Sequence, residues 1–177
     1  SALGVDADDL EGDANTSNVR LNNYPLGDPL STNERVAVNA LGDMALHHHT
    51  DPGLITLLLQ DQTGGLQTLS SEAGWIDVPP LEGSVIVNLG DVLQAYSNDV
   101  YRAAVHRVVP MRQQPRMSTP YFYNPPADAT IAPHPALCQP EAKYRPIPWR
   151  EYIGARIADN YTDLGADDTQ IDHYRVA

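Results

Sequence analysis

Residues that bind transition metals lie together in the run His47-His48-His49-Thr50-Asp51. In a β-strand, residues two apart project from the same face, so His49 and Asp51 can reach one ion. His106, in the apolar run AAVHRVV (103–109), can supply a second imidazole. Two imidazoles and one carboxylate form a facial triad with open coordination positions, which suits non-haem Fe(II) and oxygen chemistry.

Other pairings within this histidine run must be weighed, because an H-x-D pair alone recurs by chance. His47 and His49 form an H-x-H pair of the kind found in cupins, but no glutamate follows at the spacing that such a site requires. We therefore interpret His47 and His48 as packing or supporting residues.

A candidate anion site follows His106 in the sequence Arg116-Met117-Ser118. Residues 116 and 118 share one face of a strand, where the guanidinium and the hydroxyl can both donate to a carboxylate. A buried arginine requires an anion. The sequence leaves two partners open, namely an acidic side chain of the protein or the carboxylate of a ligand.

The elements that must position these residues are mostly strands. Nine short runs rich in branched, apolar and aromatic residues are each closed by Gly, Pro, Asp or another turn residue, which is typical of a sandwich or barrel. Gly64–Gly65 is predicted to form a hairpin turn. The runs are 19–25, 45–51, 54–61, 65–70, 75–80, 84–90, 93–97, 102–109 and 118–124.

A helix is predicted near the C-terminus, because apolar and aromatic residues between positions 149 and 165 recur at helical spacing. We expect its Ile153, Ile157 and Tyr161 side to pack on the outside of a sheet, with Trp149 anchoring its start and Gly165 ending it. Trp75 is expected to lie in the core. The fold class is thus all-β dominated with a C-terminal helix.

The chain is predicted to be one domain with two appended parts. Residues 1–17 form an acidic, flexible segment, 18–126 the β domain, and 127–177 a Pro-rich meander and the C-terminal helix packed on that domain. The single cysteine, Cys138, excludes an intrachain disulfide and a cysteine-based zinc site.

Charge and hydropathy narrow the classes of partner. The chain carries 23 Asp and Glu against 11 Lys and Arg, a net charge of −12 that disfavours nucleic-acid binding. No apolar run approaches the ~20 residues of a membrane helix, and the N-terminus lacks a signal-peptide pattern. We expect a cytoplasmic protein with a small-molecule partner, no nucleic acid and no membrane association; the sequence does not predict its oligomeric state.

Three segments, 49–67, 87–109 and 116–126, together resemble the Fe(II)- and 2-oxoglutarate-dependent dioxygenases. The likeness is to the branch that includes isopenicillin N synthase, ACC oxidase, and the flavonoid and gibberellin oxygenases. The upstream run VRLNNYP matches the N-x-Y-P element of that branch with Asn22 and Tyr24. The resemblance implies a double-stranded β-helix, or jelly roll, for residues 18–126.

Residue roles follow from the resemblance by position. The implied iron ligands, which are also the catalytic residues, are His49, Asp51 and His106. The implied ligands of the 2-oxoglutarate carboxylate are Arg116 and Ser118, with Tyr24 as a further donor. O₂ is the second cosubstrate, and ascorbate is a further cofactor that the resemblance allows.

The implied activity is oxidation of a small organic molecule by hydroxylation, desaturation or cyclisation, with release of succinate and CO₂. One alternative is an iron oxidase that does not use 2-oxoglutarate, like isopenicillin N synthase or ACC oxidase. Another is a non-catalytic metal-binding fragment, because the helical region that precedes the jelly roll in such enzymes is not matched. Asn88, Gly90 and Asp91 are interpreted as structural turn residues, and Ala104 stands where the family often has serine.

Overall fold

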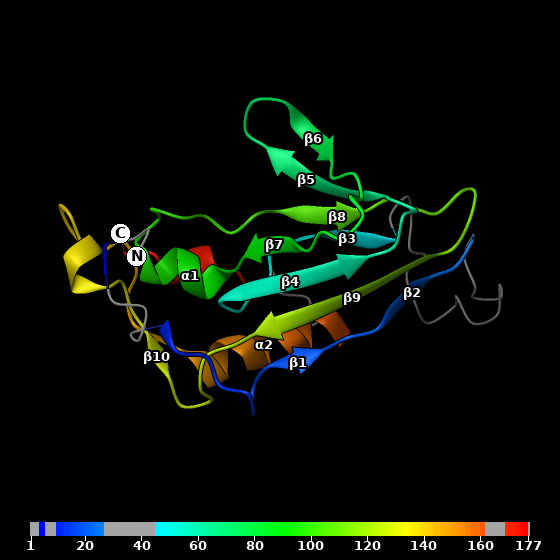
Figure 1. The fold of residues 1–177 in the computed structure, drawn as a ribbon. Coiled ribbons are helices and arrows are strands. Elements are labelled where there is room, and N and C mark those ends of the chain that lie inside the picture. Colours follow the sequence, from blue (N-terminus) through cyan, green and yellow to red (C-terminus); the bar gives the residue numbers. More distant parts are fainter. Residues whose placement is uncertain (1–3, 6–9, 27–44, 162–168, 177) are drawn as a thin grey trace.

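The computed structural model describes residues 4–5, 10–26, 45–161 and 169–176, and shows two antiparallel sheets that face each other (Figure 1). The larger sheet has the strand order β1-β9-β4-β7, and β2 also pairs with β9. The smaller has the order β3-β8-β5-β6. This arrangement confirms the predicted jelly roll, dominated by β-structure.

The strands of the larger sheet are β1 (Asn18–Val19), β2 (Asn22–Tyr24), β4 (Ile55–Gln60), β7 (Ile86–Leu89) and β9 (Arg116–Tyr123). Those of the smaller are β3 (Leu46–His49), β5 (Leu66–Ser70), β6 (Gly74–Asp77) and β8 (His106–Val108). A short pair, β10 (Thr130–Ile131) and β11 (Ile147–Pro148), leads to the helix α2 (Trp149–Tyr161). The other helical elements are α1 (Asp91–Tyr96) and two 3-10 turns at Pro135–Leu137 and Ile171–Tyr174.

Two predictions about local structure were wrong. Residues 93–96 belong to the helix α1 and Ser97 is its C-cap, so the run is not a strand, and all six residues of α1 are buried. A short apolar run with no visible period fits a buried helix as well as a strand. Gly64–Gly65 does not close a hairpin, because β4 and β5 lie in different sheets and these residues, at φ +83° and +89°, carry the chain between them.

The core consists of two clusters of buried residues. One lies between the two sheets and contains Leu58, Leu66, Val108 and Met111. The other joins the helices to the end of the larger sheet; its members are Leu54, Val92, Ala95, Ile131, Tyr144, Ile147, Trp149, Tyr152 and Ile171. The second cluster therefore fixes α1 and α2 against the domain.

The helix α2 uses a different face from the predicted one. Trp149 and Tyr152 are buried, which confirms Trp149 as the anchor of its start, whereas Ile157 is 50% exposed. Ile153 packs against the second core cluster, and both Ile153 and Ile157 line a cavity rather than packing on the outside of a sheet. The side chain of Tyr161 and the predicted stop at Gly165 lie outside the described residues.

Trp75 is also placed differently from the prediction. It is partly exposed on β6, where the Arg107 guanidinium lies 4.0 Å from the centre of its ring. Its amphipathic ring is thus used for a cation–π contact on the smaller sheet rather than for the core.

Residues 12–17 are tied to the end of β9. The Gly12 N–H donates to the Tyr123 hydroxyl (2.7 Å), and the Asp13 N–H donates to the Asn124 carbonyl (2.9 Å). The flexibility of segment 1–17 as a whole stays a prediction. Within the described residues, no helix has the length and apolar character needed to cross a membrane.

Candidate metal centre and anion pocket

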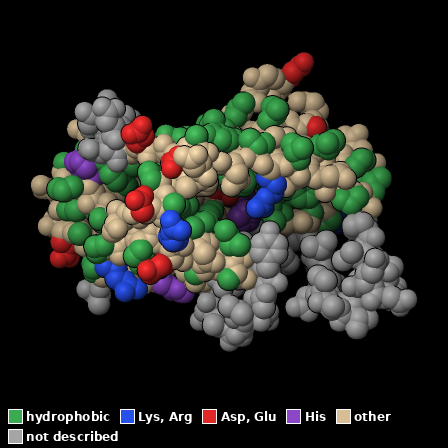
Figure 2. Space-filling view, turned by 90° about the horizontal axis from the view of Figure 1, so that it is seen from below, with side chains coloured by type: hydrophobic (Ala, Val, Ile, Leu, Met, Phe, Trp, Pro, Cys, Tyr) green, Lys and Arg blue, Asp and Glu red, His purple; other side chains and the backbone are tan. Residues whose placement is uncertain are grey.

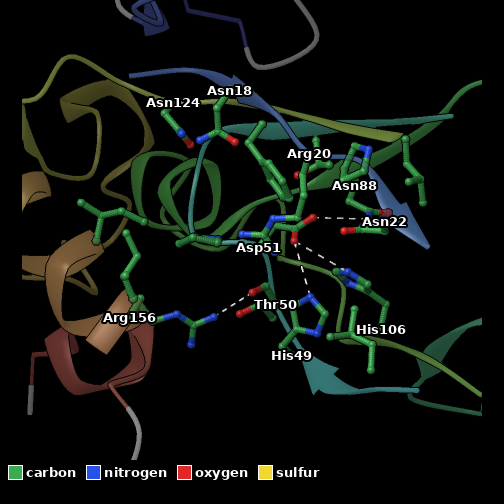
Figure 3. A pocket seen from close by; sticks show the side chains of 18 of the residues that line it. Asn18, Arg20, Asn22, His49, Thr50, Asp51, Asn88, His106, Asn124 and Arg156 are labelled. Carbon is green, nitrogen blue, oxygen red and sulfur yellow. Dashed lines mark hydrogen bonds and ion pairs between the residues drawn. The ribbon is translucent and has the colours of Figure 1, made fainter. Parts of the chain in front are cut away.

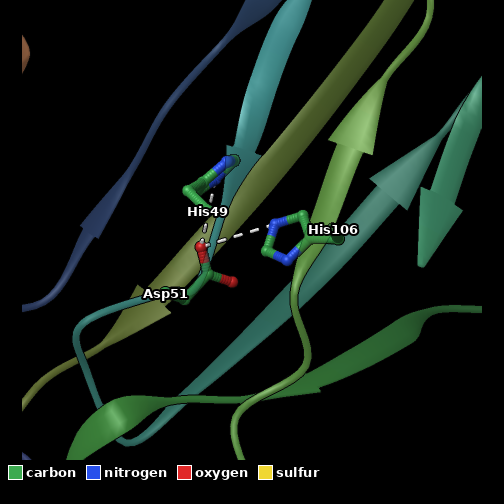
Figure 4. A group of neighbouring side chains, drawn as sticks. All are labelled: His49, Asp51 and His106. Atoms are coloured by element: carbon green, nitrogen blue, oxygen red, sulfur yellow. Dashed lines mark ion pairs between the residues drawn. The ribbon is translucent and has the colours of Figure 1, made fainter. Parts of the chain in front are cut away.

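Three metal-ligating side chains meet between the two sheets (Figure 4). His49 ends β3 and His106 begins β8, and the two are directly paired across these strands. Their Nε2 atoms lie 3.8 and 3.7 Å from the same Asp51 oxygen, Oδ1. One potential ligand atom from each residue lies within 4.8 Å of the others. The structure therefore brings the three predicted residues together.

The His106 ring is oriented by a bond to the backbone. Its Nδ1 lies 2.9 Å from the Ala104 carbonyl oxygen. As a donor to that carbonyl, Nδ1 carries the proton and leaves Nε2 with a free lone pair toward Asp51. The backbone makes this contact, so Ala104 in place of the more common serine does not disturb it.

Asp51 is held from two sides although it is buried, at 4% exposure. The Asn88 side-chain amide donates to Asp51 Oδ2 at 3.3 Å. The backbone carbonyl of Asp51 accepts a hydrogen bond from the Asp91 N–H at 2.8 Å. The start of α1 also packs closely against the turn that follows Asp51, because a Cβ on Gly90 would lie 2.1 Å from the Gly53 carbonyl oxygen. Asn88, Gly90 and Asp91 thus support a candidate ligand as well as the turn.

Asp91 connects this turn to α2. It is fully buried, and its Oδ2 accepts from the Tyr152 hydroxyl (2.6 Å) and the Thr50 hydroxyl (3.2 Å). Burial raises the pKa of Asp91, and the bonds from Tyr152 and Thr50 and the charge of Arg156 oppose that rise. The Arg156 guanidinium lies 3.9 Å from Asp91.

Arg156 also contacts directly the segment that carries two of the candidate metal ligands. Its Nη2 donates to the Thr50 carbonyl at 2.7 Å, between His49 and Asp51 (Figure 3). Sequence reasoning placed Arg156 on the helix without a role. The helical pattern alone does not indicate which distant loop a side chain will reach, so this contact required the three-dimensional structure.

Arg116 lies on the inner face of β9 and is 1% exposed. Its Nη2 donates to the Gln60 side-chain oxygen (2.9 Å) and its Nη1 to the Ser118 hydroxyl (3.3 Å). The guanidinium carbon lies 5.0 Å from the centre of the Tyr24 ring. The structure thus places Arg116, Ser118 and Tyr24 together, as predicted, and adds Gln60 to this group.

The Arg116 group retains unused hydrogen-bond donors. Within the described residues, Arg116 Nε and Gln60 Nε2 are buried without a partner, and no carboxylate lies within ion-pair distance of Arg116. Buried donors and a buried cation are costly without an acceptor. Of the two partners considered from the sequence, the structure therefore favours a ligand carboxylate.

One cavity of about 980 Å³ joins the two groups. It is lined by the three candidate metal ligands and by Arg116, Ser118 and Tyr24. His48, which is exposed, also lines it and lies 6.4 Å from the Trp75 ring; the side chain of His47 lies outside the described residues. Metal donors and an anion-binding arginine in one cavity are the parts that an oxygenase with a dicarboxylic cosubstrate requires.

Comparison with known proteins identifies the class. The model of the 2OG-Fe(II) oxygenase superfamily matches residues 16–125, and the chain belongs to this family. Among curated relatives, gibberellin 3-beta-dioxygenase 1 of Arabidopsis thaliana is 32% identical over 162 residues, covering 86% of this chain and 42% of that protein. ACC oxidase 1 of rice (Oryza sativa subsp. japonica) is 50% identical over 97 residues, covering 54% of this chain and 30% of that protein.

Solved structures agree with this assignment. A full-length Neurospora crassa protein in complex with alpha-KG matches with a TM-score of 0.74 and 37% identity, over 90% of this chain and 50% of that chain. The same protein has also been solved with alpha-KG and thymine. The present chain thus spans half or less of the length of these relatives.

Proposed function

We propose that this chain forms the catalytic jelly roll of an Fe(II)- and 2-oxoglutarate-dependent oxygenase that oxidises a small organic molecule. The observation that carries the proposal is the cavity that the His49–Asp51–His106 cluster shares with a buried Arg116, which has no carboxylate within ion-pair distance among the described residues. The family assignment supports the same chemistry.

His49, Asp51 and His106 would hold iron through two imidazole nitrogens and one carboxylate oxygen, a donor set that suits Fe(II) and leaves positions open. Iron bound there supplies O₂ activation, coupled to conversion of 2-oxoglutarate into succinate and CO₂. The protein's contribution is to fix the ligands through Asn88 and the Ala104 carbonyl.

Arg116 would bind the distal carboxylate of 2-oxoglutarate. Ser118 and Gln60 hold its two Nη atoms and fix the plane of the guanidinium, while Nε and the Gln60 amide remain as donors. Tyr24, against the guanidinium, would add a hydroxyl donor. The cosubstrate would then be oriented with its opposite, keto-acid end toward the metal ligands.

The test is the formation of succinate from 2-oxoglutarate by protein loaded with Fe(II) in the presence of O₂. We expect succinate in step with 2-oxoglutarate loss, and none from Asp51→Ala. Anaerobic addition of 2-oxoglutarate to the Fe(II) protein should also give a visible charge-transfer band. If the wild-type chain gives neither succinate nor the charge-transfer band, the proposal is contradicted.

A second candidate is an iron oxidase without 2-oxoglutarate, which the 50% identity to rice ACC oxidase 1 favours. In that case Arg116 would bind a carboxylate of the substrate or another anion. O₂ consumption with a reductant, without succinate and without the charge-transfer band, would select this candidate.

A further inference from the structure

From β1 to β2, apolar side chains point away from the cavity and polar side chains line it, which is the reverse of an ordinary sandwich strand. Val19 and Leu21 point outward and are 59% and 79% exposed. The alternate residues Asn18, Arg20 and Asn22 line the cavity instead (Figure 3). Tyr24 also lines it. Asn18 and Arg20 are exposed, so solvent reaches the polar side of this strand, and polar residues along a cavity indicate a polar ligand there rather than an apolar core.

Arg20 lies well away from the proposed 2-oxoglutarate site. Tyr24 is paired with Arg116 on β9, whereas the Arg20 N–H donates to the Pro120 carbonyl at 3.0 Å. Arg116 and Pro120 are four residues apart on β9, and four residues along a strand span about 13 Å. The backbone of Arg20, beside Pro120, is therefore about that far from the backbone of Arg116. One cavity therefore presents two separate arginines on the same sheet.

The cavity is basic although the chain is strongly acidic. Four arginines line it, and they are Arg20, Arg116, Arg150 and Arg156. Asp51 supplies the only carboxylate of the described lining residues. The whole chain has a net charge of −12. Figure 2 shows basic, histidine and acidic side chains close together in a hollow of one face. Arginines concentrated in this cavity raise the local concentration of anions.

The proposed iron and cosubstrate do not neutralise all of these charges. Asp51 and the keto-acid carboxylate balance Fe(II), the distal carboxylate balances Arg116, and Arg156 lies 3.9 Å from Asp91. Arg20 and Arg150 have no carboxylate partner within the described residues. Arg20 instead lies over the Phe122 ring, 5.5 Å from its centre.

The lining near Arg20 also has apolar surface. Phe122 lies below the guanidinium, and Ile153 and Ile157 of α2 line the same cavity. A cation beside an aromatic ring and aliphatic side chains is suited to a ligand with an apolar body and one anionic group.

We propose that the primary substrate is an organic acid with an apolar body, and that Arg20 binds its carboxylate. This inference rests on the proposed function and specifies the substrate class for the same cavity. Solvent reaches Arg20 in the described structure, and a bound acid would cover it, which strengthens the charge-assisted hydrogen bonds.

The test compares acids with their uncharged amides by calorimetry. The protein is loaded with Zn(II), which is redox-inert, and saturated with 2-oxoglutarate, so that Arg116 is occupied and no turnover occurs. The probes are phenylacetate, cyclohexylacetate and indole-3-acetate, each beside its primary amide. We expect at least one acid to bind roughly 10- to 100-fold more tightly than its amide.

The variant Arg20→Gln should remove that preference while leaving the affinity for 2-oxoglutarate unchanged, which also shows that the variant is folded. The matched control is Arg112→Gln, which removes the same charge from an exposed site outside the cavity and should keep the preference. Equal binding of acids and amides, no acid binding at millimolar concentration, or a preference that survives Arg20→Gln would overturn the proposal.

Failure of this proposal can be told apart from failure of the proposed function. Acid binding is measured without turnover, whereas the oxygenase activity is measured as succinate. A chain that binds acids through Arg20 but forms no succinate has the acid site and lacks the activity. A chain that forms succinate but shows no Arg20-dependent acid binding has the oxygenase activity and lacks the acid site.

Discussion

The two faces of the larger sheet have opposite characters. The inner face carries polar residues where a sandwich normally has its core, and the outer face carries exposed apolar ones. The inner set includes Asn22, Thr56, Gln60, Asn88, Arg116 and Ser118. The outer set includes Val19, Leu21, Leu59, Val87 and Met117, each more than half exposed.

This difference shows that the buried residues of the protein serve two purposes, a packed apolar core and a polar cavity lining. One buried apolar cluster lies between the sheets and the other joins the helices to the larger sheet, and the polar residues of the inner face line the cavity beside Leu58 and Phe122. A buried polar face is costly without ligands or partners. The difference between the faces therefore predicts large functional effects from inner-face changes and small effects from outer-face changes.

The largest effect is expected at the metal cluster that the inner face opposes. Asp51→Ala removes the only carboxylate of the cluster, and we expect loss of divalent-metal binding, measured by calorimetry with Mn(II). The circular-dichroism spectrum should remain dominated by β-structure. Metal affinity equal to that of the wild type would show that Asp51 is not a ligand.

The next largest effect is expected at Arg116. Arg116→Met should weaken 2-oxoglutarate binding by about 1.5–3 kcal/mol, because a charge-assisted hydrogen-bonded anchor is lost. Arg116→Lys, which keeps the charge and loses the planar fork, should have a smaller effect. Anaerobic calorimetry on the Mn(II) protein measures both. If all three proteins bind equally, Arg116 does not hold the cosubstrate.

A third, intermediate effect is expected from α2. Arg156→Met removes the bond to the Thr50 carbonyl, and we expect metal affinity to fall by about 10- to 100-fold as the ligand-bearing turn loses its support. The matched control is Arg145→Met, which removes an arginine that also donates to a backbone carbonyl, that of His173, away from the cavity. A fall of the same size in both variants would indicate a general loss of stability instead.

The smallest effect is expected on the outer face. Leu21→Ser replaces a side chain that is 79% exposed, and we expect the free energy of unfolding to change by no more than about 0.5 kcal/mol. Urea unfolding measures this change, and 2-oxoglutarate affinity should be unaltered. A loss of several kcal/mol would mean that the two faces are not as different as their exposure indicates.

Much of the site could be predicted because it depends on period-two spacing. Arg116 and Ser118 lie two residues apart within β9, so strand geometry places them on one side, whereas Asp51 lies two residues beyond the end of β3 and reaches the same point from the turn that follows His49. His106, far along the chain, was a candidate second imidazole from its residue type alone, and its direct pairing with His49 across β3 and β8 is seen only in the structure. No local rule specifies which distant strands become neighbours.

The parts that sequence reasoning missed involve contacts between elements. Asp91 was interpreted as a turn residue, yet it links Thr50 to Tyr152. The run 93–97 was assigned to a strand because its burial on all sides leaves no amphipathic period to read. Gly64–Gly65 has the composition of a hairpin turn, and only the sheet order shows that it connects two sheets.

The exposed apolar face also determines how ionic strength acts on the chain. At low salt, a net charge of −12 keeps copies apart, because their repulsion extends over about 10 Å at 0.1 M salt. At 1 M salt the screening length falls to about 3 Å, and the attraction between apolar faces is then no longer opposed. Self-association of this chain should therefore increase with salt, the reverse of what a surface held together by ion pairs would show.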